Sequence, residues 1–487
     1  MTSSPDIASR VFTLSDQREF ARVSGDFNPL HLDADFARRT QFGAPVVHGI
    51  HTVLWALDSL LRSEQFDLRS LRVLFHQPLF LDETVTVRKG AQTEAVMGLD
   101  VVAAGTVVTS IKLSSQPGKV AGPVAGDLPA IPERFEHPAD VAFEEMPGRR
   151  GAVAAPANDD EIGRLFPALA KAVGAAGVRG LMATSQIVGM ACPGLHSLFS
   201  GLDVTFDDMP GGQHALGYAV SKASARFRSV QIDVAGSGLT GRLDAFARRP
   251  PSAQADMNTV SMRVAGTPFS GQRALVIGGS RGLGEVTAKI IAAGGGHPVI
   301  TFREAAQEAE QVAAAIRQAG GTCDVIRHDV LDRASEWLDN VGVVDSCYYF
   351  ATAKIFQRKS ALFEPDKLVV FLDYYADGFS RLCTALAQRS AGTTAIFYPS
   401  TTALDVPVAG TAEYAMAKAA GETLANHLNA FQPGLKVISR RLPRIATDQT
   451  ATVGVAAAQD ALDVLLPIVH EVQQAARPAA QASRERS

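Results

Sequence analysis

Residues 24–33 read SGDFNPLHLD and residues 42–49 read FGAPVVHG, and these two stretches decide the fold of the N-terminal part. Asp26 and His31 stand five positions apart, and Pro29 between them stiffens the turn. Apolar neighbours supply walls around these polar groups. Because a carboxylate beside an imidazole in an apolar pocket can hold a water molecule and move its proton, the pattern predicts an acid–base site.

Together the two stretches resemble the active-site loop of the MaoC-like (R)-specific enoyl hydratases and dehydratases, which have the hotdog fold. The resemblance implies that Asp26 and His31 add water to an acyl thioester or remove it. It also implies that the amide of Asn28 belongs to this site and that the main-chain amide of Gly49 donates to the thioester oxygen. The alternative interpretation is a polar surface turn, which the combination of SGD, NP and HG disfavours.

A second signature, RALVIGGSRGLG, spans residues 273–284. An apolar strand at 274–277 enters a glycine-rich turn, and a helical pattern follows from 285 to about 293. Glycines let the backbone approach a pyrophosphate, which then faces the N-terminus of the helix. The residues expected to hold a dinucleotide here are Gly278, Ser280, Arg281, Gly282, Leu283 and Gly284.

Residues 414–418 read YAMAK, which places Tyr414 and Lys418 on one helical face. We expect Lys418 to lower the pKa of Tyr414, so that the phenol exchanges protons with a carbonyl or an alcohol. The motif alone also fits an ordinary amphipathic helix. With the glycine turn roughly 130 residues upstream, it resembles the short-chain dehydrogenase/reductase family and its β-ketoacyl reductases, over about residues 269–468.

Cofactor choice is predicted from the end of the second strand, where many members of that family have an acidic residue and this chain has Arg303. An arginine there suits a 2′-phosphate, and Arg281 adds a second cation, so the pair favours NADPH over NADH. The resemblance further implies that Asp329 contacts the adenine and that Thr447 holds the nicotinamide amide.

This chain departs from the family pattern at several places, including Ile277 where a threonine is usual and Arg444 where a glycine is usual. Residues 349–352 read YFAT where the family usually has NNAG, and Tyr375 stands where an asparagine relays protons. The hydroxyl that holds the substrate oxygen is expected from Ser400 or Thr401. These departures leave open whether the C-terminal domain turns over substrate.

The order of helices and strands predicts the fold class. A helix followed by strands occurs twice in the first half, which predicts an α+β double hotdog, and a later strand–helix alternation predicts an α/β Rossmann-like, doubly wound parallel sheet. The second repeat lacks the SGDxNPxH motif, and we interpret its His196 as a core residue. The predicted domains are an active hotdog at 1–135, a second hotdog at 136–265, a reductase domain at 266–475 and a flexible tail at 476–487.

Composition limits the class of protein. The chain has 487 residues, enough for about three domains, and its net charge of −4 gives no indication of nucleic-acid binding. Its four cysteines lack metal-ligand spacing, which predicts reduced buried thiols, a cytoplasmic protein and no metal site. We find no signal-peptide pattern and no membrane-spanning run, and we expect a homodimer.

Hydratase and reductase chemistry are consecutive steps on acyl chains. The sequence therefore predicts a bifunctional enzyme that reduces 3-oxoacyl thioesters with NADPH and dehydrates the product, in fatty acid or polyketide biosynthesis. The carrier would be coenzyme A or an acyl carrier protein. Two alternatives remain open: hydration followed by oxidation, as in β-oxidation, or a dehydratase whose reductase-like domain is a non-catalytic scaffold.

Overall fold

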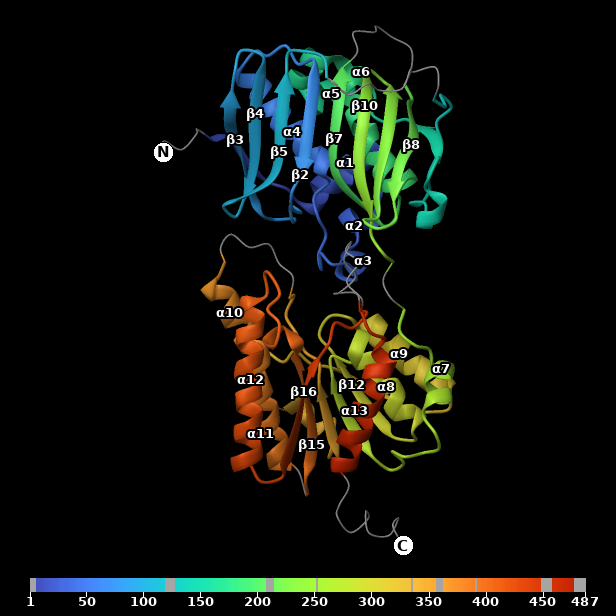
Figure 1. Cartoon of the computed structure of the whole chain (residues 1–487), viewed down its shortest axis with the longest axis vertical. Helices are drawn as coiled ribbons and strands as arrows, with labels where there is room; N and C mark the ends of the chain where they lie inside the picture. Colours follow the sequence, from blue (N-terminus) through green and yellow to red (C-terminus); the bar gives the residue numbers. More distant parts are fainter. Residues whose placement is uncertain are drawn as a thin grey trace. The chain divides into compact units, whose positions relative to one another are not determined.

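The computed structural model describes residues 6–118, 128–206, 214–250, 253–333, 336–355, 362–389, 392–447 and 458–476 (Figure 1). The chain forms two compact units, whose described residues run from 6 to 250 and from 253 to 476. None of the helices in these described ranges combines the length and apolar composition that a membrane crossing needs.

The N-terminal unit is built on one ten-stranded antiparallel sheet with the order β1-β3-β4-β5-β2-β7-β10-β9-β8-β6. The second half of this order mirrors the first, and the halves join where β2 pairs with β7, Leu71 facing Val204. The strands are β1 (Asp6–Val11), β2 (Ser70–Phe75), β3 (Thr84–Gln92), β4 (Val96–Ala103), β5 (Thr106–Ser114), β6 (Arg150–Val153), β7 (Ser197–Phe206), β8 (Leu216–Ser224), β9 (Ser229–Gly236) and β10 (Leu239–Ala247).

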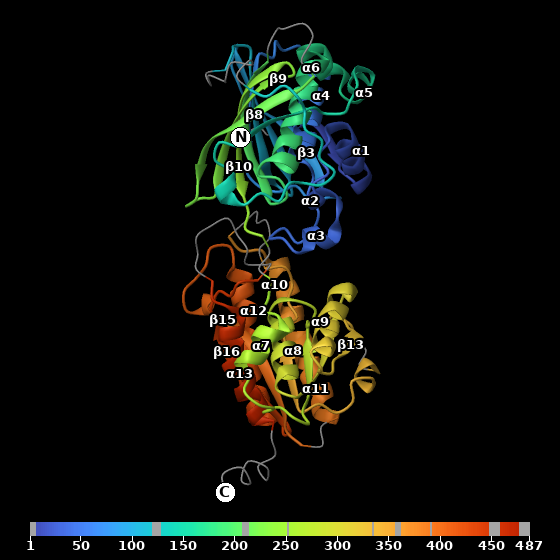
Figure 2. The ribbon, with the colours of Figure 1, turned by 90° about the vertical axis from the view of Figure 1, so that its right-hand side faces the viewer.

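Two long helices, one from each half, lie side by side against this sheet (Figures 1 and 2). They are α4 (Gly49–Ser63) and α6 (Pro167–Gln186), and α6 continues as the π-helix η3 (Ile187–Ala191). Leu57 of α4 and Leu181 of α6 are fully buried in one hydrophobic core that spans both halves. The predicted double hotdog is confirmed. Its shorter helices are α1 (Leu14–Ser24), α2 (Pro29–Leu32), α3 (Ala34–Arg38), α5 (Asp159–Leu165) and the 3-10 helix η2 (Phe143–Glu145).

The C-terminal unit contains a six-stranded parallel sheet with the order β13-β12-β11-β14-β15-β16. From β11 the chain adds strands outward on one side of the sheet as far as β13, and from β14 it adds them on the other side. This change of side between β11 and β14 is typical of the predicted doubly wound fold, which is confirmed. The strands are β11 (Arg273–Ile277), β12 (His297–Phe302), β13 (Asp324–Arg327), β14 (Ser346–Tyr349), β15 (Thr394–Thr401) and β16 (Leu435–Leu442).

Helices cover both faces of the parallel sheet, because alternate side chains of each strand point to opposite faces. On β11, the side chain of Val276 packs in the hydrophobic core on one face of the sheet, and that of Leu275 packs in the core on the opposite face. One layer of helices covers each face. The first layer contains α7 (Met257–Arg263), α8 (Gly282–Ala293), α9 (Ala306–Gln318) and α13 (Ala461–Ala475). The second contains α10 (Pro365–Leu372), the π-helix η5 (Asp373–Gly378), α11 (Phe379–Arg389) and α12 (Ala412–Phe431). Two 3-10 helices, η4 (Glu336–Asp339) and η6 (Thr402–Leu404), complete the unit.

The structure differs from the expected organisation around residue 250. Helix α7 lies in a segment expected at the end of the second hotdog, yet Met257 and Val260 are buried in the core of the C-terminal unit. Arg248 lies in a segment with the composition of a linker, but only 3% of its surface is exposed. All four cysteines are buried and unpaired, as expected. The expected tail lies outside the described residues from 477 onward.

Candidate active sites

The loop after α1 is shaped by Gly25, which ends that helix with a φ of 78°. A Cβ at this position would lie 2.6 Å from the amide nitrogen of Gln186, so only glycine fits between α1 and α6. Asn28 then starts α2, because its side chain accepts a hydrogen bond from the Leu30 amide at 3.0 Å. The same side chain donates to the Gly189 carbonyl at 2.9 Å, which ties the loop to the second half of the unit.

Asp26 is 2% exposed, and its carboxylate accepts two hydrogen bonds. The Ser185 hydroxyl donates to Oδ2 at 2.7 Å, and the main-chain amide of Asn28 donates to Oδ1 at 3.2 Å. A Cβ at Gly189 would collide with this carboxylate, so a glycine is required there as well. Ser185 and Gly189 both come from the half that lacks the motif, so the two halves build one site.

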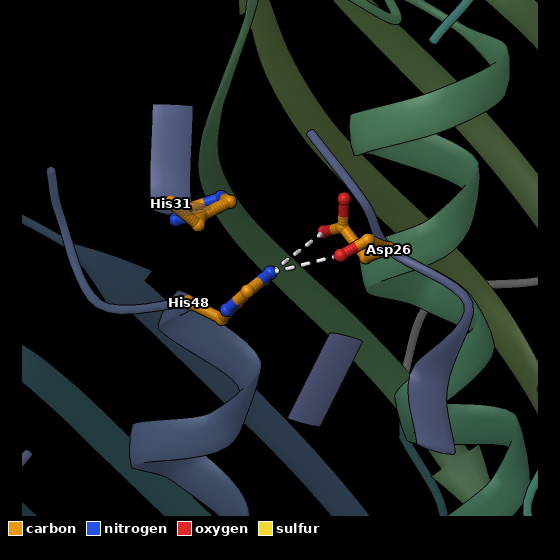
Figure 3. Close-up of side chains that lie close together, drawn as sticks. All are labelled: Asp26, His31 and His48. Carbon is orange, nitrogen blue, oxygen red and sulfur yellow. Dashed lines mark hydrogen bonds and ion pairs between the residues drawn. The ribbon is translucent and has the colours of Figure 1, made fainter. Parts of the chain in front are cut away.

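His31 and His48 lie beside Asp26 with their rings stacked, 3.8 Å between centroids (Figure 3). His31 Nδ1 is 2.8 Å from the Val46 carbonyl oxygen. Because a carbonyl can only accept, Nδ1 donates, and neutral His31 presents the lone pair of Nε2. His31 thus lies in one cluster with Asp26, and a second imidazole, that of His48, lies 3.9 Å from the Asp26 carboxylate.

Burial changes the acidity of both predicted acid–base groups. It raises the pKa of Asp26, against smaller lowering effects of His31 and Ser185. Burial also lowers the pKa of His31, against the raising effect of Asp26. Since the ordinary values are 3.8 and 6.5, both shifts favour the neutral forms of the two groups. A neutral imidazole can accept a proton and a neutral carboxyl group can donate one, so the two groups are suited to acid–base work.

His48 fixes the geometry of this cluster. Its Nδ1 lies 2.9 Å from Gln17 Oε1, and its Nε2 lies 3.1 Å from the Asp26 main-chain oxygen and 3.9 Å from Asp26 Oδ2 (Figure 3). Ligating atoms of Asp26, His31 and His48 lie within 4.8 Å of one another, close enough for a metal ion. A metal would have to displace the hydrogen bonds of His48 and Asp26, so the arrangement favours proton transfer over metal binding.

Gly49 is the first residue of α4, where main-chain amides have no partner within the helix. A Cβ there would lie 2.7 Å from the Phe75 ring, so the position requires glycine. The N-terminus of a helix favours negative charge, which suits the predicted contact with a thioester oxygen.

In the C-terminal unit, the glycine-rich turn links β11 to α8. Gly278 and Gly282 have φ values of 77° and 58°, which side chains rarely adopt. A Cβ at Gly284 would collide with the Gly278 carbonyl, so the third glycine allows close packing. Thr447 lies next to the turn, its Cγ2 3.7 Å from where a Cβ of Gly282 would be. Arg281 is the N-cap residue of α8, flanked by Ser280 on the turn and followed in the helix by Leu283.

Arg303 and Asp329 also lie close together. The Arg303 guanidinium donates to the Tyr374 hydroxyl at 2.7 Å, pairs with Glu304 at 3.0 Å and lies 4.0 Å from the Asp329 carboxylate. About half of the Arg303 side chain is exposed, so it can still reach a ligand.

Tyr414 and Lys418 occupy the start of α12, as predicted, but their electrostatics differ from the expectation. Burial raises the pKa of Tyr414, and a hydrogen bond with Thr401 opposes that rise. Lys418 Nζ donates to the Pro399 carbonyl at 2.6 Å and lies 3.9 Å from the centre of the Tyr375 ring. Burial lowers the pKa of Lys418 to about 7. The expectation that Lys418 lowers the pKa of Tyr414 is therefore wrong for this structure, since the ammonium group faces Tyr375.

Two of the departures from the family pattern contact each other. Tyr375 is buried in η5, and its hydroxyl is hydrogen-bonded to Thr352 of the YFAT run. Of the two candidate hydroxyls, Thr401 is the one bonded to Tyr414, whereas Ser400 donates to Glu422 at 2.5 Å. The geometry thus favours Thr401 as the partner of Tyr414.

Two separate segments of the chain match known protein families. Residues 3–110 match the MaoC like domain, and residues 272–452 match the short chain dehydrogenase family. The chain carries a MaoC-like domain followed by a short-chain dehydrogenase domain. Asp26, His31 and Gly49 lie within the first match, and the glycine-rich turn, Tyr414 and Thr447 lie within the second.

Relatives resemble parts of this chain. The peroxisomal hydratase-dehydrogenase-epimerase of Saccharomyces cerevisiae is 29% identical over 120 residues, 24% of this chain and 13% of that protein. The (R)-specific enoyl-CoA hydratase of Aeromonas caviae is 39% identical over 83 residues, 16% of this chain and 60% of that protein. A short chain dehydrogenase from Burkholderia cenocepacia J2315, solved in complex with NADP, is 25% identical, with a TM-score of 0.38 over 42% of this chain and 91% of its own. The match covers less than two thirds of either curated relative.

Several residues of the MaoC-like site were not predicted as site residues. His48 stood in the quoted FGAPVVHG stretch, so its closeness to Gly49 was an available signal. Ser185 and Gly189 gave no local signal, because their contacts with Asp26 cross about 160 positions of the chain and depend on the pairing of the two halves.

Proposed function

We propose that the chain is a bifunctional acyl-thioester enzyme. Residues 6–250 would carry (R)-specific hydration and dehydration of enoyl and 3-hydroxyacyl thioesters. Residues 253–476 would carry NADPH-dependent reduction of 3-oxoacyl thioesters. The substrate carrier would be coenzyme A or an acyl carrier protein, in fatty acid or polyketide biosynthesis, and the enzyme would work as a cytoplasmic homodimer.

One observation carries the hydratase proposal: Asp26 and His31 lie in one cluster with His48, and burial raises the pKa of Asp26 and lowers the pKa of His31. In dehydration, the pair takes the proton from the α-carbon and delivers a proton to the leaving hydroxyl, which departs as water. In hydration, water loses a proton to the pair, its oxygen bonds to the β-carbon, and the α-carbon receives a proton. Gly49 would stabilise the negative charge that develops on the thioester oxygen.

The reductase proposal rests on the residues around Tyr414. The glycine-rich turn fits a nicotinamide dinucleotide, since Gly278 and Gly282 adopt conformations that let the backbone approach a pyrophosphate. The cofactor, when bound, supplies the hydride. Tyr414 would then protonate the carbonyl oxygen, and Thr401 would hold that oxygen. Arg303 and Arg281 would favour the 2′-phosphate of NADPH, with Asp329 near the adenine and Thr447 near the nicotinamide.

Two alternatives retain support. Relatives whose names join a hydratase to a dehydrogenase support the opposite direction, hydration followed by oxidation. The Tyr375–Thr352 pair, which replaces the family's asparagine and NNAG turn, supports a short-chain dehydrogenase domain that acts as a scaffold.

Purified protein given a 3-oxobutanoyl thioester and NADPH tests the proposal. We expect NADPH to be consumed and a but-2-enoyl thioester to accumulate, as measured by absorbance and mass spectrometry. Hydration of that enoyl thioester without NADPH consumption would contradict NADPH-dependent reduction and leave the two alternatives. Turnover of neither the 3-oxobutanoyl nor the but-2-enoyl thioester would contradict the whole proposal.

A further inference from the structure

Arg248 is a buried cation directly after β10, in the half of the N-terminal unit that lacks the motif. It is 3% exposed, and its two side-chain hydrogen bonds are long: Nε donates to the Ser197 carbonyl at 3.3 Å and Nη2 to the Leu195 carbonyl at 3.4 Å. A guanidinium has five N–H groups, so these bonds leave donors unused. Within the described part of the chain, no carboxylate forms an ion pair with Arg248.

Such an arrangement is costly for the folded protein. Burial lowers the pKa of Arg248 to about 10, so the group keeps its charge at neutral pH. Removing an ion from water without a countercharge is unfavourable, and buried charges are usually paired for this reason. The Phe42 ring, 5.8 Å from the guanidinium carbon, offsets only a part of that cost. A charge kept in this state is better explained by a ligand than by stability.

Arg248 borders the site around Asp26. The Leu195 carbonyl that accepts from Arg248 also accepts from Asn28 Nδ2 at 3.5 Å, so one carbonyl connects the guanidinium to the acid–base loop. Phe42 begins the second stretch of that site. Burial lowers the pKa of His31, and the charge of Arg248 lowers it further, so the two groups are electrostatically coupled.

A second buried polar side chain, His196, lies next to Arg248; its Nε2 is 3.6 Å from the Asp140 carboxylate. His196 is 9% exposed, and its Nδ1 has no hydrogen bond within the described residues. Its main-chain oxygen accepts a hydrogen bond from the Arg248 amide at 2.7 Å, and burial followed by the Arg248 charge lowers the pKa of its side chain. We interpreted His196 as a hydrogen-bonded core residue, but this ring nitrogen is left for a ligand.

We propose that Arg248 binds a carboxylate at the far end of the acyl group, so that the hydratase site takes monothioesters of unsaturated dicarboxylic acids. This inference rests on the proposed hydratase function and names its substrate class. A carboxylate matches the planar fork of a guanidinium and neutralises its charge. The thioester oxygen has its own donor at the start of α4, and a diphosphate would have to give up more hydration than this buried position can replace.

Paired substrates test this inference in the wild-type protein. Crotonyl-CoA and the mono-CoA thioester of trans-butenedioic acid differ only in the end group, methyl against carboxylate. Pent-2-enoyl-CoA and the mono-CoA thioester of pent-2-enedioic acid form a second pair, one methylene longer. We expect kcat/KM to favour the carboxylate in at least one pair. Preference for the methyl substrate in both pairs would overturn the inference, whereas hydration of no substrate would overturn the proposed function itself.

Variants assign the preference to Arg248. We expect Arg248→Met to lower the carboxylate-to-methyl ratio of kcat/KM about 10- to 100-fold, as for loss of a charge-assisted hydrogen bond. Arg242→Met is the matched control, because Arg242 is an arginine of β10 that pairs with Asp233 at 2.7 Å. It should leave the ratio unchanged.

An equal fall on both substrates after Arg248→Met would show that the arginine stabilises the thioester enolate, and would contradict the inference. If that variant does not fold, Arg248→Lys keeps the charge and loses the fork, and it should retain an intermediate ratio. A wild-type ratio in the folded Arg248→Lys and Arg248→Met proteins would also contradict the proposal.

Discussion

The Ser185 hydroxyl donates a hydrogen bond of 2.7 Å to Asp26, across the boundary between the half that carries the motif and the half that lacks it. This bond lowers the pKa of Asp26 against the larger raising effect of burial. The half of the N-terminal unit that lacks the motif therefore influences the pKa of Asp26 and also forms part of the wall of the site.

Replacing this hydroxyl should weaken hydration. In Ser185→Ala the Asp26 carboxylate loses a donor, so its pKa rises further and the acidic limb of the kcat/KM profile moves to higher pH. A bond to a charged group is worth about 1.5–3 kcal/mol, so we expect a loss of about 10- to 100-fold. The measurement is the pH profile of crotonyl-CoA hydration. Thr184→Val is the control, because the Thr184 hydroxyl donates to the Leu181 carbonyl of its own helix. An unchanged limb in Ser185→Ala would contradict the role of this bond.

His51 should make the N-terminal unit sensitive to acid. Burial lowers the pKa of His51 from 6.5 to about 3, so the unfolded chain binds a proton in that range that the folded chain does not. As the pH falls from 6.5 to about 3, this residue alone should lower the free energy of unfolding by about 1.4 kcal/mol for each pH unit. His51→Phe keeps the ring that stacks on Phe20 and removes the titration.

The two tryptophans allow this measurement in one unit, since Trp55 lies in the N-terminal unit and Trp337 in the C-terminal unit. In a Trp337→Phe background, Trp55 fluorescence during urea unfolding reports the N-terminal unit. We expect His51→Phe to flatten the dependence of stability on pH below 6.5. Parallel curves with and without His51 would contradict the shifted pKa.

Tyr414→Phe should abolish reduction of a 3-oxoacyl thioester while hydration continues. The change removes the hydroxyl that would protonate the carbonyl and keeps the ring, which packs edge-on against Tyr375. NADPH consumption measures the loss. Tyr348→Phe is the control, because it removes a buried hydroxyl on the opposite face of the sheet, whose hydrogen bond is 3.5 Å long. Reduction at the parental rate in Tyr414→Phe would remove this residue from the mechanism.

Arg303 should set the preference for NADPH. The wild-type protein should bind NADPH at least tenfold more tightly than NADH, because one charge-assisted hydrogen bond to the 2′-phosphate is worth about 1.5–3 kcal/mol. Arg303→Ala should narrow that difference in calorimetric titrations. Arg317→Ala changes an equally exposed arginine on α9 and should leave the difference in affinity between NADPH and NADH unchanged. Equal affinities of the wild-type protein for the two cofactors would exclude this assignment.

Local patterns were sufficient to predict both folds and the positions of Asp26, His31, Tyr414 and Lys418, because these residues follow from spacing along one segment. Contacts between distant segments were not predictable in this way. Ser185 reaches Asp26 only because the halves share a sheet. Arg248 lies in a run of arginines and prolines that reads as a linker, and its burial depends on β10 pairing with β7.

Tyr375 illustrates a second limit. The sequence shows it only as a departure from the family pattern, and the structure shows what accompanies it: a hydrogen bond with Thr352, another departure, and a ring beneath the Lys418 ammonium. Burial raises the pKa of Tyr414, and spacing along a helix determines neither this burial nor the position of the Lys418 ammonium.

Hydration of crotonyl-CoA by the Asp26→Asn and His31→Ala proteins is the most direct test of the account. We expect each change to reduce kcat/KM about 10²- to 10⁴-fold, because each removes one of the two groups that share the proton of water. Binding of NADPH, measured on the same samples, should be unchanged, since that site lies in the other unit. Asp35→Asn and His76→Ala, at exposed positions of the N-terminal unit, should hydrate at the wild-type rate. Hydration near the wild-type rate in both the Asp26 and the His31 variants would contradict the account.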